Sequence, residues 1–204
     1  KNADCVLTVS NSLKKEFSKI AKNIAVITNG FDDEVLENRN VALDKKFSIS
    51  YIGLLPKQSN PKMFFKVLEK LCKEDITFKK DLQLNLIGDI ADEVKKEIDE
   101  TNLNNNTNFV GYVSHEKAIE YQQKAQVLLL LIPNVKNNKG ILTGKLFEYL
   151  TAKRPILAMG PEDGDLQEIL ENTNSGVVIN YNSEEKLTLE IERLYKRYKT
   201  GFLE

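Results

Sequence analysis

Short apolar runs alternate with helix-forming stretches along almost the whole chain, and this alternation limits the possible folds more than any other feature. Several runs lack the polar alternation of half-exposed strands, as expected of strands that are covered on both faces. The sequence therefore predicts an α/β fold with a doubly wound, mostly parallel sheet. The expected strands are 5–9, 24–28, 47–51, 82–87, 107–110, 127–132, 156–158 and 176–179, and the expected helices lie near 11–22, 60–74, 91–101, 115–125, 143–152, 164–172 and 184–199.

Composition limits the classes of function. With 204 residues, 41% of them hydrophobic, the chain is long enough to bury a core. It has 29 basic and 30 acidic side chains, and neither sign forms a long block, so no nucleic-acid partner is expected. No apolar run reaches the roughly 18 residues of a membrane span. Cys5 and Cys72 have neither pairing nor metal spacing, so we expect reduced, buried thiols in a cytoplasmic protein.

The segment 140–160 is the strongest candidate for chemistry. A loop with Gly140 and Gly144 leads into an apolar helix that carries one acid, Glu148. The free N–H groups of a helix N-terminus can hold a phosphate, and a carboxylate one turn further reaches a group attached to it. A nucleotide presents a diphosphate and a ribose diol in that order. The alternative is an ordinary helix with an exposed Glu148, although a glycine-rich entry is a poor helix start unless its amides are used.

Other loops at strand ends carry weaker signals. Gly53 allows close approach of a ligand to the backbone, and Lys57 or Lys62 can meet phosphate charge, although a plain loop with surface lysines is favoured. Asp89 is expected to cap the next helix. His115, the only histidine, is expected to be exposed in a first helical turn without a catalytic partner.

Asp163-Gly164-Asp165 has the form of an Asp-x-Asp metal motif. A turn followed by a helix N-cap explains it without a metal, because aspartate stabilises a helix N-terminus. No His, Cys or Asp cluster elsewhere in the sequence has metal-ligand spacing. We therefore expect no metal site.

Taken in order, these pieces resemble the donor-binding half of GT-B glycosyltransferases, the group 1 or family 4 set that uses nucleotide sugars. The resemblance covers nearly the whole chain, and the ordered set is more specific than any single piece. It implies a Rossmann-like domain that forms one half of a two-domain architecture. The matching pieces are 3–10, 26–32, 47–53, 86–88, 109–113, 145–157, 163–165 and 176–178.

The resemblance also implies roles for single residues. Glu148 matches the second glutamate of the family's Glu, seven residues, Glu motif, which contacts the ribose hydroxyls. Thr143, Gly144 and Lys145 fall where the family holds the diphosphate. Lys145 and Glu148 are therefore the expected catalytic residues, and the Lys145 cation would stabilise the departing diphosphate. The other expected donor contacts are Gly53, Lys57, Tyr112 and Val113, the last two in the loop that lines the base.

Two positions depart from the family pattern. Gly140 stands where the first glutamate of the motif is expected, and that glutamate usually touches the transferred sugar. Leu54 replaces the arginine that often follows the glycine at 53, which leaves Lys57 or Lys62 as substitutes. The identity of the sugar is therefore left open, as is activity itself.

The resemblance extends to domains and reaction. Residues 1–32 are expected to be the remnant of an N-terminal acceptor domain with the interdomain crossing, and residues 33–204 the nucleotide-sugar domain. The chain begins without an initiator methionine, so we expect a piece of a longer protein, inactive alone because transfer needs both faces of the cleft. The expected reaction is transfer, with retention and without cofactor or metal, to a glycan or lipid-linked acceptor.

The same resemblance implies a setting and leaves alternatives. It indicates a bacterial, cytoplasmic enzyme of polysaccharide or cell-envelope biosynthesis, with peripheral association at the inner face of the membrane left open. One alternative is a non-catalytic nucleotide-binding or scaffold module of the same fold. Another is a nucleotide-sugar epimerase, which would need catalytic acids and histidines, whereas this sequence has a single histidine.

Overall fold

A six-stranded parallel sheet forms the centre of the molecule. The computed structural model describes residues 3–31 and 41–201. The chain runs outward from β3 through β4 to β5, then returns to the other side of β3 and continues through β6, β7 and β8, giving the order β5-β4-β3-β6-β7-β8. This reversal confirms the doubly wound fold and creates a switch point beside β3. The strands are β3 (Phe47–Ile52), β4 (Leu82–Ile87), β5 (Thr107–Gly111), β6 (Val127–Leu131), β7 (Ile156–Met159) and β8 (Gly176–Ile179).

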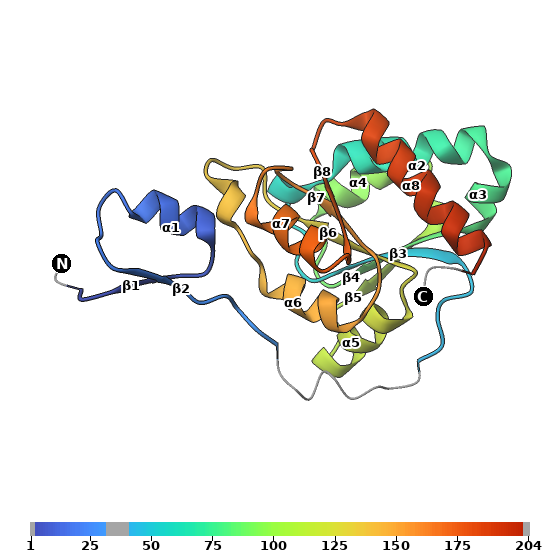
Figure 1. The fold of residues 1–204 in the computed structure, drawn as a ribbon. Helices are drawn as coiled ribbons and strands as arrows, with labels where there is room; N and C mark the ends of the chain where they lie inside the picture. Colours follow the sequence, from blue (N-terminus) through green and yellow to red (C-terminus); the bar gives the residue numbers. More distant parts are fainter. Residues whose placement is uncertain (1–2, 32–40, 202–204) are drawn as a thin grey trace.

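Helices cover both faces of this sheet (Figure 1). Because no face is left to solvent, β3, β6 and β7 are buried along their whole length. The unbroken apolar runs of β6 and β7 predicted this, whereas β3 also buries two serines, Ser48 and Ser50. One layer holds α2 (Lys62–Glu74), α3 (Ile76–Asp81), α4 (Asp92–Glu100) and α8 (Glu184–Lys199), and the other holds α5 (His115–Lys124), α6 (Gly144–Thr151) and α7 (Asp165–Asn172). None of the described helices is long and apolar enough to cross a membrane.

The N-terminal residues form a separate small unit (Figure 1). β1 (Val6–Thr8) and β2 (Ile24–Val26) pair in parallel, with α1 (Asn11–Phe17) between them. Ser10 caps α1, which ends at Phe17 instead of continuing to residue 22 as expected. The expected domain boundary at 32/33 lies outside the described residues and stays a prediction.

One helix was not expected from the sequence. α3 occupies Ile76–Asp81 directly after α2, in a stretch that the sequence pattern left unassigned. Its N-cap is Asp75, whose carboxylate accepts the backbone N–H groups of Thr77 at 2.7 Å and Phe78 at 3.2 Å. The aspartate is the sequence signal that would have found this helix.

Two expectations about single residues are wrong. Asp89 does not cap α4, because the N-cap position is Ala91 and no side chain caps that helix. The Asp89 carbonyl oxygen instead accepts the N–H of Leu55 at 2.9 Å, which joins the loops after β3 and β4. Cys72 is buried as expected, but Cys5 is exposed.

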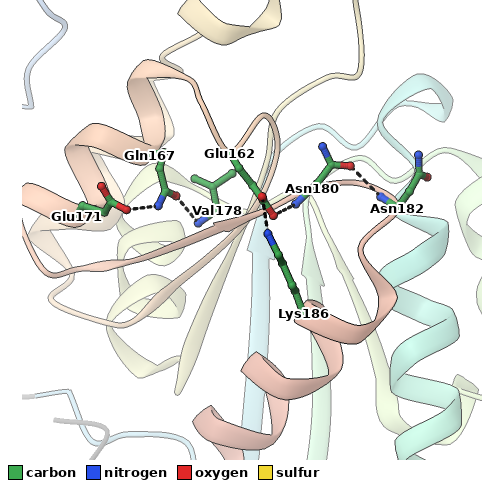
Figure 2. Close-up of polar contacts among 7 residues, drawn as sticks. All are labelled: Glu162, Gln167, Glu171, Val178, Asn180, Asn182 and Lys186. Atoms are coloured by element: carbon green, nitrogen blue, oxygen red, sulfur yellow. Dashed lines mark hydrogen bonds and ion pairs between the residues drawn. The ribbon is translucent and has the colours of Figure 1, made fainter.

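The loop after β7 is fastened to the edge strand β8 (Figure 2). Glu162 accepts the N–H of Asn180 at 3.2 Å and pairs with Lys186 at 2.7 Å. The side-chain oxygen of Gln167 accepts the N–H of Val178 at 3.0 Å, which satisfies a donor that the sheet edge leaves unpaired.

The same loop contains the Asp-x-Asp sequence, whose carboxylates have different partners. Asp163 forms an ion pair with Lys139, and Asp165 accepts the N–H of Ser12 in α1 at 2.9 Å. Neither aspartate caps α7, because Gly164 occupies the N-cap position, so the expected aspartate cap is wrong. The residues that the structure describes contain no group of three or more His, Cys, Asp or Glu able to hold a metal.

Candidate functional site

Three neighbouring strands end in glycines, which we call the glycine edge: Gly53 after β3, Gly88 after β4 and Gly111 at the end of β5. All three have positive φ, and Gly88 N–H donates to the Gly111 carbonyl at 2.8 Å. A Cβ on Gly88 would lie 2.5 Å from the Gly53 carbonyl oxygen, so this position requires glycine. The edge exposes backbone at the carboxyl ends of the strands, where α/β sheets bind their ligands.

The N-terminus of α6 lies against this edge. A Cβ on Gly53 would lie 2.5 Å from Cε of Lys145, which places that side chain directly over the glycine. The N-cap residue Thr143 makes no capping bond, and the first turn of α6 contains no acidic residue. Thr143 Oγ1 is buried and has no hydrogen-bond partner among the described residues. The partial positive charge at this helix end is therefore available to an anion.

Tyr51 positions the Lys145 ammonium. Lys145 Nζ donates to Tyr51 Oη at 2.8 Å and lies 4.3 Å from the centre of the ring. Tyr51 Oη in turn donates to the Leu54 carbonyl at 2.7 Å, and burial raises the pKa of this phenol, so it stays neutral. Burial also lowers the pKa of Lys145 to about 8, although the nearby Glu148 carboxylate favours the charged form. An anion beside Lys145 would hold it protonated.

Gln122 holds the carboxylate of Glu148. Gln122 is only 1% exposed, and its Nε2 donates to Glu148 Oε2 at 3.0 Å. Its own Oε1 is buried without a partner among the described residues. The other oxygen of Glu148 receives no hydrogen bond within the described parts of the chain. One side of the carboxylate is thus fixed by α5, and the other can accept from a ligand.

Tyr149 fastens α6 to the end of β3. It is fully buried, and its hydroxyl accepts the N–H of Ile52 at 3.1 Å. Leu146, Phe147 and Leu150 have the apolar spacing of one helix face, but only Leu146 of these is fully buried. Tyr149 follows Leu146 by three residues, and this helical spacing is the signal that would have placed it on the same face.

The structure brings most of the predicted site residues together. Gly53, Thr143, Gly144, Lys145 and Glu148 lie at or beside the start of α6. Tyr112 follows Gly111 on the same edge and is 93% exposed, while Val113 is half-buried against the core below α5 and α6.

The two lysines after β3 have other contacts. Lys57 pairs with Glu93 at 3.1 Å, and Lys62 pairs with Glu97 at 3.2 Å, both on α4. The cation that lies over Gly53 is instead Lys145.

Gly140 lies at the contact with the N-terminal unit. It is buried in η4 (Asn138–Gly140), and a Cβ there would lie 2.9 Å from Ser10 Oγ and 3.0 Å from Leu13 Cγ. α1 therefore fills the space next to this position. A glutamate at 140 would require α1 to move.

Comparison with solved structures shows the same fold. Sucrose-phosphate synthase from Thermosynechococcus elongatus matches with a TM-score of 0.76 at 16% identity, over 99% of this chain and 51% of that one. Anabaena Alr3699/HepE, solved in complex with UDP and glucose, matches with a TM-score of 0.76 at 15% identity, over 98% and 56%. The chain thus spans about half the length of these proteins.

A shorter structure matches nearly end to end. It is the C-terminal domain of a group 1 glycosyl transferase (LpcC) from Francisella tularensis, with a TM-score of 0.60 at 15% identity, over 85% of this chain and 92% of that one. No curated protein matches the sequence. The family model described as glycosyl transferases group 1 matches residues 32–200, which is most of the chain. The chain therefore belongs to the group 1 glycosyl transferase family.

Proposed function

We propose that this chain binds the nucleotide-sugar donor of a glycosyltransferase. The observation that carries the proposal is the uncapped N-terminus of α6 against the glycine edge, with Lys145 and Glu148 on its first two turns. A nucleoside diphosphate needs an anion site and, beyond it, an acceptor for ribose hydroxyls. HepE was solved with UDP and glucose, and a TarM variant with UDP and saccharides, which supports UDP as the first nucleotide to test.

Each group in the site has a role in this proposal. The α6 amides beside Thr143 and Gly144 hold the diphosphate, and the Lys145 cation offsets the charge that develops on it as the sugar departs. Glu148 accepts the ribose hydroxyls. Gly53 has no side chain, so the ligand can approach the backbone of the glycine edge closely. Tyr112 and Val113 line the base. No metal or cofactor is required in this scheme.

The acceptor side belongs to the longer protein in our proposal. Residues 1–32 would be the end of an acceptor domain with the crossing segment, and residues 33–204 the donor domain. Transfer would retain the anomeric configuration and extend a polysaccharide or a lipid-linked glycan of the cell envelope. We place the enzyme in the bacterial cytoplasm, in peripheral contact with the inner face of the membrane.

Titration calorimetry of the chain with UDP and uridine tests the donor site. Lys145→Ala should weaken the binding of UDP about tenfold and the binding of uridine little, because it removes a charged phosphate contact. Glu148→Gln should weaken both ligands alike. Lys96→Ala and Glu168→Gln are matched controls on exposed positions of α4 and α7. Equal UDP affinity in the wild type and both site variants would refute the assignment.

A non-catalytic module of the same fold is the second candidate. It is favoured by Gly140, which lacks the expected glutamate and packs against α1. The epimerase alternative has no such support, because His115 is exposed in the first turn of α5, as predicted. Release of nucleoside diphosphate from nucleotide sugars by the longer protein would exclude the non-catalytic candidate.

A further inference from the structure

Arginines gather around one cavity far from the glycine edge. The sequence has 25 lysines but only four arginines, and Arg154, Arg193 and Arg197 line this single cavity. The fourth, Arg39, lies outside the described residues. The cavity has a volume of about 550 Å³ and opens at the amino ends of β7 and β8, where α6 and α7 end and α8 passes.

Basic side chains outnumber acidic ones in the part of the lining that the structure describes. Lys153 joins the three arginines there against one acidic residue, Glu190, whereas the whole chain has a formal charge of -1. Glu190 also orients one of the cations, since Arg193 Nε and Nη2 donate to its carboxylate at 2.8 and 2.6 Å. Arg154 is 8% exposed and is held by a bond from its Nε to the Ala125 carbonyl at 2.9 Å.

The chemistry of the lining favours phosphate. The planar guanidinium matches phosphate oxygens in pairs, which a lysine ammonium does not. On the loop before β8, Thr173 Oγ1 donates to the Ile169 carbonyl at 2.8 Å, so the Ser175 hydroxyl, 2.7 Å from it, is the one of the pair that can donate to a phosphate oxygen. The volume lies within the range of small-ligand sites. We propose that this cavity, the arginine cavity, is a binding site for a phosphate ester.

The arginine cavity is separate from the donor site. It lies at the amino ends of the strands, whereas the glycine edge lies at their carboxyl ends. A ligand there does not touch Lys145 or Glu148, so it is distinct from any ligand of the donor site. The proposal is independent of the proposed function and would stand if the chain bound no nucleotide.

Amide chemical shifts of the ¹⁵N-labelled chain test the site with a soluble monoester, glycerol 3-phosphate. We expect shifts of Ser175, Gly176 and Val177, and no shift of Gly53 or Gly144 at the same concentration. Arg193→Gln with Arg197→Gln should weaken binding about tenfold or more, because two charged contacts are lost. Lys14→Gln with Lys15→Gln removes the same charge from exposed positions of α1 and should change nothing.

A second arm identifies the source of the phosphate. Sedimentation with vesicles of phosphatidylcholine plus phosphatidylglycerol, against phosphatidylcholine alone, reports a lipid headgroup. Arginine-dependent binding to anionic vesicles supports the proposal with a headgroup as ligand, and arginine-dependent shifts with glycerol 3-phosphate support it with a soluble ester. Arg193→Lys with Arg197→Lys keeps the charge and should restore only part of the affinity. Failure of both probes, or equal binding by the Gln variant with an intact amide spectrum, would overturn it.

Discussion

The sites proposed at the two ends of the sheet are built in different ways. At the carboxyl ends of β3, β4 and β5, positive-φ glycines and the start of α6 present backbone groups, with Lys145 and Glu148 held by buried partners. At the amino ends of β7 and β8, the arginine cavity presents long cationic side chains. Backbone sites have a fixed shape and tolerate few substitutions, whereas a site made of side chains depends mainly on charge.

The contrast predicts where mutations are costly. At the glycine edge, replacing one glycine strains a positive-φ backbone and alters the spacing between two neighbouring strands. Around the arginine cavity, Arg193 is half-exposed, whereas the Glu190 side chain is only 13% exposed, so loss of their pair costs the fold about 1 kcal/mol. Measurements at each end can therefore strengthen or break this comparison.

The largest expected effect is that of Gly88→Ala. Its φ of 117° is strained for alanine, and the new Cβ would lie 2.5 Å from the Gly53 carbonyl, so we expect a loss of about 3 kcal/mol in unfolding free energy. Gly111→Ala is the matched control, because its φ is also positive but a Cβ there meets no atom within 4 Å. Gly111→Ala should lower the free energy of unfolding by about 1–2 kcal/mol. Urea denaturation measures both, and equal losses would show that the close contact is relieved by small shifts.

The next effect is a pH dependence of UDP binding. The pKa of Lys145 is about 8 in the free site, and a bound diphosphate raises it, so binding takes up a proton near that pH. Affinity should therefore be full below about pH 7 and fall about tenfold by pH 9. Calorimetry at pH 8 in buffers of different ionisation enthalpy measures the uptake. Lys145→Arg, which stays charged, should show no uptake and no fall over this range.

The sequence was sufficient for most of the fold. All eight strands of the described residues were predicted, because each is a short stretch rich in apolar residues between helix-forming segments. The end of α1 was not, because Leu13, Phe17 and Ile20 continue the helical apolar spacing beyond Phe17, where the helix stops. α3 is only six residues long, too short for periodicity to reveal it.

The candidate site was predicted from two sources. Spacing in one loop and helix joined Gly144 to Glu148, and the family resemblance added Thr143, Lys145 and the distant Gly53. Tyr51 and Gln122 are 94 and 26 residues from their partners, and only the fold brings them there. The arginine cavity was not predicted from the sequence for the same reason, since its cations come from the turn after α6 and from α8.

A smaller effect is expected of Gln122→Met. This change removes the hydrogen bond to Glu148 and also the buried Oε1 that has no partner among the described residues, so stability should change little. The carboxylate loses its anchor, and UDP should bind about fivefold more weakly. Gln123→Met is the control, because Gln123 makes no bond to Glu148 and likewise has an unpartnered Oε1. Equal affinities in the two variants would mean that the Gln122 bond does not position Glu148.

The smallest expected effect is that of the arginine cavity on UDP. Strands of four to six residues separate the two ends of the sheet by about 13–20 Å, whereas the Debye length in 0.15 M salt is about 8 Å. Arg193→Gln with Arg197→Gln should thus change UDP affinity by less than about twofold at 0.15 M salt. At about 0.01 M salt the Debye length reaches roughly 30 Å, and the lost cations should then weaken UDP modestly. A loss of UDP affinity that persists at high salt cannot be caused by long-range electrostatic interactions. It would mean that the sheet couples its two ends mechanically.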